Sequence, residues 1–318
     1  MSRNLAPLFL LLLTLTVSAQ TNPSMTSQRN DAEKDDLYSA FNDNKKVPTP
    51  DRQRQAYEAA TKYLRLYGAD NDFYAPEMRK FVTNYEKGFR LRELLQAYGS
   101  KNYKKTYDAG RVLLKATDDD FYVLAILTQA GFESAQAGMT EFKADAITYA
   151  NKAIQLLENG KVKTTDPFAN EQTAIGTLNF DLGFLLRAEA PAQAADAFVK
   201  AAKSDSSFSK DPLTYNLLGI VLLKGEYATL SADYNSRFGN KQSSPEQQAA
   251  MQKLMHVADR AIDAYARAVA LSTKPEQQEA KTKMLGQLTA LYKNFHNNSD
   301  EGLAELLATV LAKSLPSP

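Results

Sequence analysis

Apolar side chains recur at three- and four-residue spacing along nearly the whole chain from about Asp31 onward. Phe81, Tyr85 and Phe89 form one such series. This spacing places apolar residues on one face of an α-helix, whereas a half-buried strand needs strict alternation of polar and apolar positions. No stretch of six residues shows a convincing alternation. The pattern therefore predicts an all-α protein.

Prolines indicate where the helices begin. Proline is tolerated in the first helical turn, and a Ser, Thr or Asp before it caps the free N–H groups. On this basis helices are predicted to start near residues 50, 76, 167, 191, 212, 245 and 275. Glycine-, asparagine- and aspartate-containing breaks between these starts divide the chain into about thirteen helices, most of about 12–25 residues. Helices of this length joined by short turns are typical of stacked helical hairpins.

A Leu-Gly pair recurs in the second half of the chain, at Leu182-Gly183, Leu218-Gly219 and Leu285-Gly286. Behind the first pair stand Ala195, Val199 and Ala202, and the same spacing reappears at Ala261, Tyr265 and Ala268. A leucine can pack inside a helical pair while the adjacent glycine lets the partner helix approach closely, and small alanines on the second helix accept that approach. The repeat therefore predicts helix pairs in close contact.

This pattern resembles the tetratricopeptide repeat, a helix-turn-helix unit of about 34 residues. The clearest unit spans residues 172–207, and a second spans 212–271. The resemblance implies a right-handed α-solenoid of stacked helical hairpins over residues 31–314, with capping helices in 275–314. Residues 84–116 and 121–158 are more divergent hairpins.

Two positions of the first unit differ from the family pattern. Asn179 stands where the family usually has a large aromatic residue, and Ala190 where it often has glycine. The next unit has the aromatic residue, Tyr215, but its Leu218 lies 43 residues before Ala261. About 30 residues near 227–257 are therefore predicted to be an insertion.

The N-terminus has the composition of a secretory signal peptide. Arg3 is followed by an apolar stretch of 13 residues and then by the small-residue pattern Val17-Ser18-Ala19. An apolar stretch this short is below the roughly 20 residues needed to span a bilayer, so cleavage after Ala19 is favoured over a membrane anchor. We expect residues 1–19 to be removed, 20–30 to form a flexible leader, and the protein to be exported, either periplasmic or secreted. No integral membrane segment is expected after cleavage.

The 318 residues include 38 Lys and Arg, 37 Asp and Glu, 2 His and no Cys. Removing residues 1–19 deletes only Arg3 from this charge count and leaves a neutral chain. A neutral chain has no electrostatic attraction to nucleic acid, so no nucleic-acid partner is expected. The absence of cysteine excludes disulfides, thiolate metal sites and a catalytic cysteine.

Catalytic and ligand-binding motifs are scarce. The two histidines, His256 and His296, fall in separate predicted helices, and no metalloprotease, nucleophile-elbow, P-loop or dinucleotide motif is present. Asp118 to Asp120 directly precede an apolar helix and are interpreted as its cap. Asp70-Asn71-Asp72 begins like a calcium-binding loop, but Ala75 occupies the position that needs glycine. No catalytic, cofactor-binding or metal-binding residue is predicted.

These observations favour a non-enzymatic protein–protein interaction or scaffolding protein of the bacterial cell envelope or exterior. A glycan-binding accessory module for a cell-wall or polysaccharide enzyme is one alternative. An all-α hydrolase that uses paired carboxylates is another.

The resemblance assigns the concave wall of the array to residues two before and two after each repeat leucine. The predicted partner-binding residues are Phe180, Phe184, Arg187, Asn216, Ile220 and Lys224. They would suit a peptide with hydrophobic anchors and an acidic flank. The alternative is that Phe180 and Phe184 pack against a neighbouring helix or the inserted segment.

Overall fold

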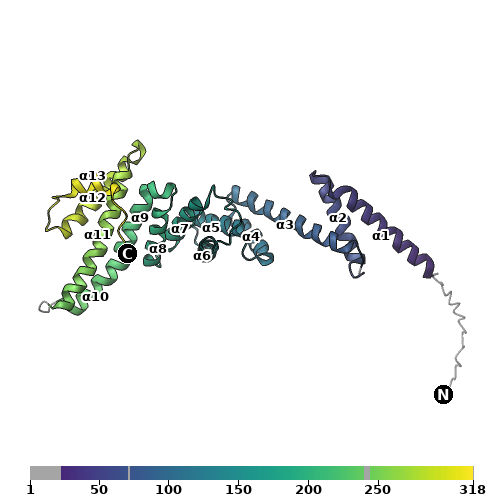
Figure 1. Ribbon diagram of the computed structural model, residues 1–318, viewed down its shortest axis with the longest axis horizontal. Helices are drawn as coiled ribbons and strands as arrows, with labels where there is room; N and C mark the ends of the chain where they lie inside the picture. Colours follow the sequence, from purple (N-terminus) through teal and green to yellow (C-terminus); the bar gives the residue numbers. More distant parts are fainter. Residues whose placement is uncertain (1–22, 71, 240–243, 318) are drawn as a thin grey trace, which may run out of the picture. The chain divides into compact units, whose positions relative to one another are not determined.

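The computed structural model describes residues 23–317 except residue 71 and residues 240–243. Over these residues the chain is built from α-helices, with three short 3₁₀ segments and one π-helical turn, and it contains no strand (Figure 1). The predicted all-α class is confirmed. No helix within the described ranges is both long and apolar enough to cross a lipid bilayer. The predicted signal peptide, residues 1–19, lies outside the described residues.

The chain divides into two compact units, one ending at Phe89 and the other beginning at Arg90. The first contains α1 (Pro23–Lys45), α2 (Pro50–Tyr67) and the first part of α3 (Ala75–Gly99). Its core is formed by Phe41, Ala60, Tyr63 and Met78, which are fully buried. The flexible leader expected over residues 20–30 is replaced from Pro23 onward by the first turns of α1.

The second unit is a succession of helices that pack in chain order (Figure 1). After the end of α3 come α4 (Tyr103–Ala116), α5 (Phe121–Gln136), α6 (Lys143–Glu158), α7 (Glu171–Leu186), α8 (Pro191–Lys203) and α9 (Pro212–Leu222). They are followed by α10 (Ala228–Phe238), α11 (Pro245–Leu271), α12 (Gln278–Phe295) and α13 (Leu303–Thr309). Each of α4 to α8 packs against the helix that follows it, α9 packs against α11, and α11 packs against α12.

The helix starts at prolines are largely confirmed, and one is wrong. Helices begin at Pro50, Pro191, Pro212 and Pro245, as predicted. Pro167 instead lies in the connection before α7. That helix begins at Glu171 because the side chain of Asn170 accepts the free N–H of Thr173 at 2.8 Å and caps it.

The Leu-Gly register holds in two hairpins and fails in the third. Leu182, Gly183, Leu218 and Gly219 are all buried against the second helix of their pair. By contrast, Leu285 on α12 is 36% exposed, and a β-carbon on Gly286 would meet nothing within 4 Å. The third Leu-Gly pair therefore faces away from the helix contact, which uses Met284 and Leu288 instead.

The residues predicted as an insertion lengthen both arms of one hairpin. From α9 the chain continues through the π-helical turn η2 (Leu223–Tyr227) into α10, and α11 returns over 27 residues. The two arms are joined by the ion pair of Arg260 with Glu226 at 2.8 Å and by a 3.1 Å hydrogen bond from Gln247 to Tyr234. Periodicity could not distinguish such an extension from a separate loop, because both arms keep the helical spacing.

Candidate functional site

The predicted site residue Phe180 is part of the core. Its side chain is 4% exposed, and its ring lies 5.9 Å from that of Phe132 in α5 and 5.7 Å from that of Phe198 in α8. It also stands 4.8 Å from Phe208 in the 3₁₀ segment η1 (Ser207–Lys210). Phe180 therefore packs against neighbouring helices, which was the alternative expectation for it. Its buried side chain is not presented to a partner.

Phe184 and Arg187 form a cation–aromatic pair at the end of α7. The guanidinium carbon of Arg187 lies 3.5 Å from the centre of the half-buried Phe184 ring, which also meets Phe132 edge to face at 4.9 Å. Arg187 donates a hydrogen bond to the carbonyl of Phe184. Partial burial lowers the pKa of Arg187, and no described carboxylate forms an ion pair with it. Both side chains of the pair are half-buried.

An open groove of about 370 Å³ lies between α9 and α12, which both pack against α11. We call it the α9–α12 groove. Its lining includes Leu213, Asn216 and Ile220 from α9 and Ala280, Met284 and Gln287 from α12. Leu213 is 45% exposed although it is apolar. Two predicted site residues, Asn216 and Ile220, are thus brought together here, whereas Lys224 is exposed one turn further along and does not line the groove.

The carboxamide oxygen of Asn216 is an unsatisfied acceptor in this groove. Its Oδ1 is shielded from solvent and accepts no hydrogen bond from the described residues. A buried acceptor without a donor costs free energy, so an incoming N–H group would be stabilised there. Apolar walls beside one free acceptor suit a peptide, which offers apolar side chains and backbone N–H groups together.

The sequence pattern does not predict the α12 side of the groove. It predicts capping helices over residues 275–314 and a repeat contact at Leu285-Gly286, whereas Ala280, Met284 and Gln287 line the groove. The signal that could have found the groove is the four-residue step from Ala280 to Met284, which continues to the buried Leu288 and not to Leu285.

Two acidic residues, the buried Asp181 of α7 and the half-buried Glu133 of α5, are electrostatic neighbours. Asp181 is 2% exposed, and its Oδ2 has no hydrogen-bond partner. Burial, reinforced by repulsion from Glu133, raises the pKa of Asp181 well above its ordinary value. Glu133 accepts hydrogen bonds from the hydroxyls of Tyr98 at 2.7 Å and Tyr103 at 3.2 Å. A substrate cannot reach the deeply buried carboxyl of Asp181, so these two groups do not form a pair of exposed catalytic carboxylates.

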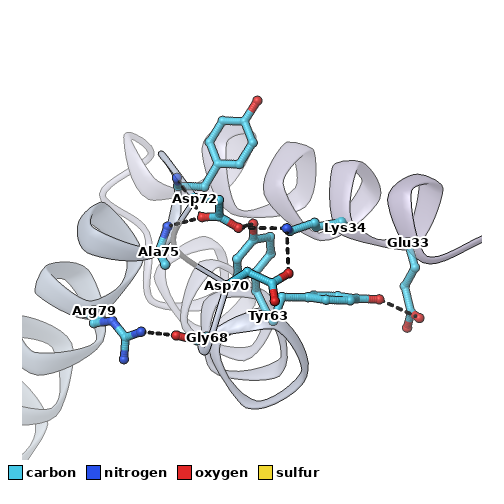
Figure 2. A network of polar contacts seen from close by, with 10 residues as sticks. Glu33, Lys34, Tyr63, Gly68, Asp70, Asp72, Ala75 and Arg79 are labelled. Atoms are coloured by element: carbon cyan, nitrogen blue, oxygen red, sulfur yellow. Dashed lines mark hydrogen bonds and ion pairs between the residues drawn. The ribbon is translucent and has the colours of Figure 1, made fainter. Parts of the chain in front are cut away.

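The first unit contains a dense polar network in which Lys34 of α1 contacts both Asp70 and Asp72 at 2.9 Å (Figure 2). Asp72 also accepts the N–H groups of Tyr74 and Ala75 at 3.0 Å, which caps the start of α3. Burial acts to raise the pKa of Asp72, but hydrogen bonds from Tyr63 and Lys34 outweigh it and lower that pKa to about 2. The ammonium group of Lys34 supplies the positive charge that faces the carboxylates of Asp70 and Asp72. The network thereby anchors the turn between α2 and α3.

The two histidines both act electrostatically on one carboxylate, although His256 belongs to α11 and His296 follows the end of α12. Partial burial raises the pKa of Asp259 in α11, and the electrostatic effects of His296 and His256 offset part of that rise. His296 stacks on Tyr292 with ring centres 3.8 Å apart and contacts its carbonyl oxygen at 2.9 Å. Within the described ranges no three His, Asp or Glu side chains are grouped so that they could hold a metal ion.

Fold and groove together define an all-α protein of sequentially packed helical hairpins with an apolar surface groove. Comparison of the chain with protein-family models, with curated proteins and with solved structures found no match.

Proposed function

We propose that this protein is a non-enzymatic interaction or scaffolding protein that binds an extended segment of a protein partner in the α9–α12 groove. The observation that carries the proposal is the open, apolar groove between α9 and α12, which has the unsatisfied acceptor of Asn216 in its lining. The resemblance to tetratricopeptide repeats supports the same surface, because that family uses its first helices to hold peptides.

The ligand is a peptide with at least one aliphatic or aromatic anchor and a free backbone N–H beside it. The anchor would pack on Leu213, Ile220 and Met284, where burial of apolar area supplies most of the binding free energy. The N–H would donate to Oδ1 of Asn216. The predicted signal peptide supports a place for this function in the cell envelope or outside the cell.

A peptide array probed with the protein tests the proposal, and the chain offers a matched pair of variants for it. Ala280→Glu puts a charged side chain into the groove at an exposed position, whereas Ala290→Glu makes the same change at an exposed α12 position that does not line the groove. We expect apolar-anchored peptides to bind the wild type and the Ala290→Glu variant and to lose about tenfold or more in affinity for Ala280→Glu.

Two results would contradict the proposal. Equal peptide binding by both variants would place the peptide elsewhere. Selective retention of sugars on a glycan array, abolished by Ala280→Glu, would favour the glycan-binding alternative instead.

A further inference from the structure

The C-terminal segment of the chain is bound to α11 as an extended peptide would be. Arg267 is 5% exposed, and its guanidinium donates hydrogen bonds to the carbonyl oxygens of Lys313 at 2.9 Å and Ser314 at 3.0 Å. Leu315 packs against two apolar clusters, one containing Leu218 and the other Tyr215. The segment is thus held by backbone hydrogen bonds and one leucine anchor.

The repeat register identifies which residues of the preceding hairpin, α7 and α8, correspond to the residues of α9 and α11 near the C-terminal segment. Leu182 corresponds to Leu218 on the first helices, and Ala195 corresponds to Ala261 on the second helices. By the same register Asn179 stands where the next hairpin has Tyr215, and Ala201 stands where it has Arg267. The ring of Tyr215 and the guanidinium of Arg267 lie 6.0 Å apart in the occupied hairpin.

A groove of about 320 Å³ is open at this earlier place, lined by residues of α6, α7 and α8. We call it the α6–α8 groove. Its apolar lining includes Ile154, Leu182 and Leu186, and Asn179 also lines it. Asn179, which lines the groove, is much smaller than the Tyr at the equivalent position, whereas Ala201 is fully buried in the core and does not line the groove.

The polar rim of the α6–α8 groove carries one unpaired acidic side chain. Lys200 crosses from α8 to Glu158 at the end of α6, at 2.7 Å, so these two charges neutralise each other. Asp196 is exposed on the same rim and forms no hydrogen bond or ion pair with another described residue. The side-chain amides of Gln155 and Gln193 are likewise unpaired among the described residues, so they can bond to a peptide backbone.

We propose that the α6–α8 groove is a second binding site, separate from the α9–α12 groove, for an extended protein segment with a leucine anchor and a basic residue near it. The leucine packs on Leu182 and Leu186, the amides of Gln155 and Gln193 bond to the segment's backbone, and the basic residue pairs with Asp196. The sequence Lys313-Ser314-Leu315 has this chemistry and is already bound to the next hairpin, by hydrogen bonds from Arg267 and by packing of Leu315 against the cluster that contains Tyr215.

The test uses a fluorescent peptide of residues 311–318, Leu-Ala-Lys-Ser-Leu-Pro-Ser-Pro, whose binding to the chain is followed by anisotropy. Asn179→Tyr introduces the residue that the next hairpin has at this position and fills the groove. We expect it to weaken peptide binding about tenfold or more. Asn179 is 2% exposed, so the helical circular-dichroism signal is measured alongside to verify that the variant stays folded. Asp196→Lys should weaken binding several-fold at low salt, and Asp119→Lys, the same charge change at an exposed position outside the groove, should not.

Three outcomes would overturn this proposal. One is the absence of binding at about 1 mM peptide. A second is binding that Asn179→Tyr leaves intact and Leu315→Ala strengthens, which would show that the peptide exchanges with the chain's own C-terminal segment at Arg267. The third is binding that Ala280→Glu abolishes and Asn179→Tyr does not, which would assign the peptide to the α9–α12 groove.

Discussion

The ring of Phe198 in α8 lies so close to Gly183 in α7 that a β-carbon on this glycine would fall 3.0 Å from three of its carbons. The next hairpin repeats this contact, since a β-carbon on Gly219 would fall 2.9 Å from the ring of Tyr265. Real β-carbon contacts this short are strained, so both pairs of helices are packed at the limit that glycine allows.

Gly183→Ala should therefore destabilise the protein, by about 1–2 kcal/mol, although alanine is the better helix former. Gly286→Ala is the matched control, because open space surrounds that glycine and the helix gains about 0.5–1 kcal/mol from alanine. Urea unfolding of both variants measures the difference. Equal effects at the two glycines would contradict the packing described for α7 and α8.

Ala202→Leu should destabilise the protein by about 1–3 kcal/mol. Ala202 is buried at the end of α8 in the cluster with Tyr215 and Tyr265, and extra methyl groups there force neighbouring side chains apart. Lys200→Leu on the same helix should change stability by less than about 0.5 kcal/mol, because Lys200 is exposed and its ion pair with Glu158 is solvated. An unchanged melting temperature for Ala202→Leu would show that the repeat register is wrong at this helix.

Asp181→Asn should stabilise the protein at neutral pH. Because the folded state raises the pKa of Asp181, folding favours the protonated carboxyl. The stability linked to this group is complete below its unfolded pKa and is lost as the pH rises through the folded pKa. The variant removes that loss, so we expect a gain on the order of 1 kcal/mol at pH 7.5 and a smaller difference near pH 4.

Melting temperatures of the wild type and Asp181→Asn, measured between pH 4 and 8, provide the check. A difference between the two proteins that does not change with pH would mean that Asp181 is ionised in the folded state.

Arg267→Met should cost on the order of 3 kcal/mol. The guanidinium of Arg267 pairs with Asp263 at 2.6 Å, where both side chains are largely buried, and it also holds the carbonyls of Lys313 and Ser314. Its removal leaves the Asp263 carboxylate buried without its partner. Adding Asp263→Leu should recover part of the loss, which a double-mutant cycle by urea unfolding measures. Simple additivity of the two changes would argue against this coupling.

The exported protein should begin at Gln20 or at its cyclised form. The apolar stretch ahead of Val17-Ser18-Ala19 is the basis for this expectation. Intact-mass measurement of the protein recovered from periplasm or medium decides it. Full-length chain in the membrane fraction would instead indicate an uncleaved anchor.

The sequence alone was sufficient for the features that depend on neighbouring residues. Helical periodicity, together with capping groups and prolines, predicted the helix starts at Pro191, Pro212 and Pro245, because these signals act within one or two turns. The contact of Leu182-Gly183 with the second helix of its pair was also predictable. A short connection of fixed length leaves two adjacent helices little choice of partner.

Only the tertiary structure determined which face of each helix meets solvent and which meets the next hairpin. The same Leu-Gly pair is buried at Leu218-Gly219 and exposed at Leu285-Gly286. Phe180 enters the core, while Asn216 and Ile220 line a groove whose other side comes from α12. Glu133 and Asp181 become electrostatic neighbours although 47 residues separate them. These relationships depend on how successive hairpins pack, and small rotations of a helix about its axis exchange buried and exposed positions without changing its periodicity.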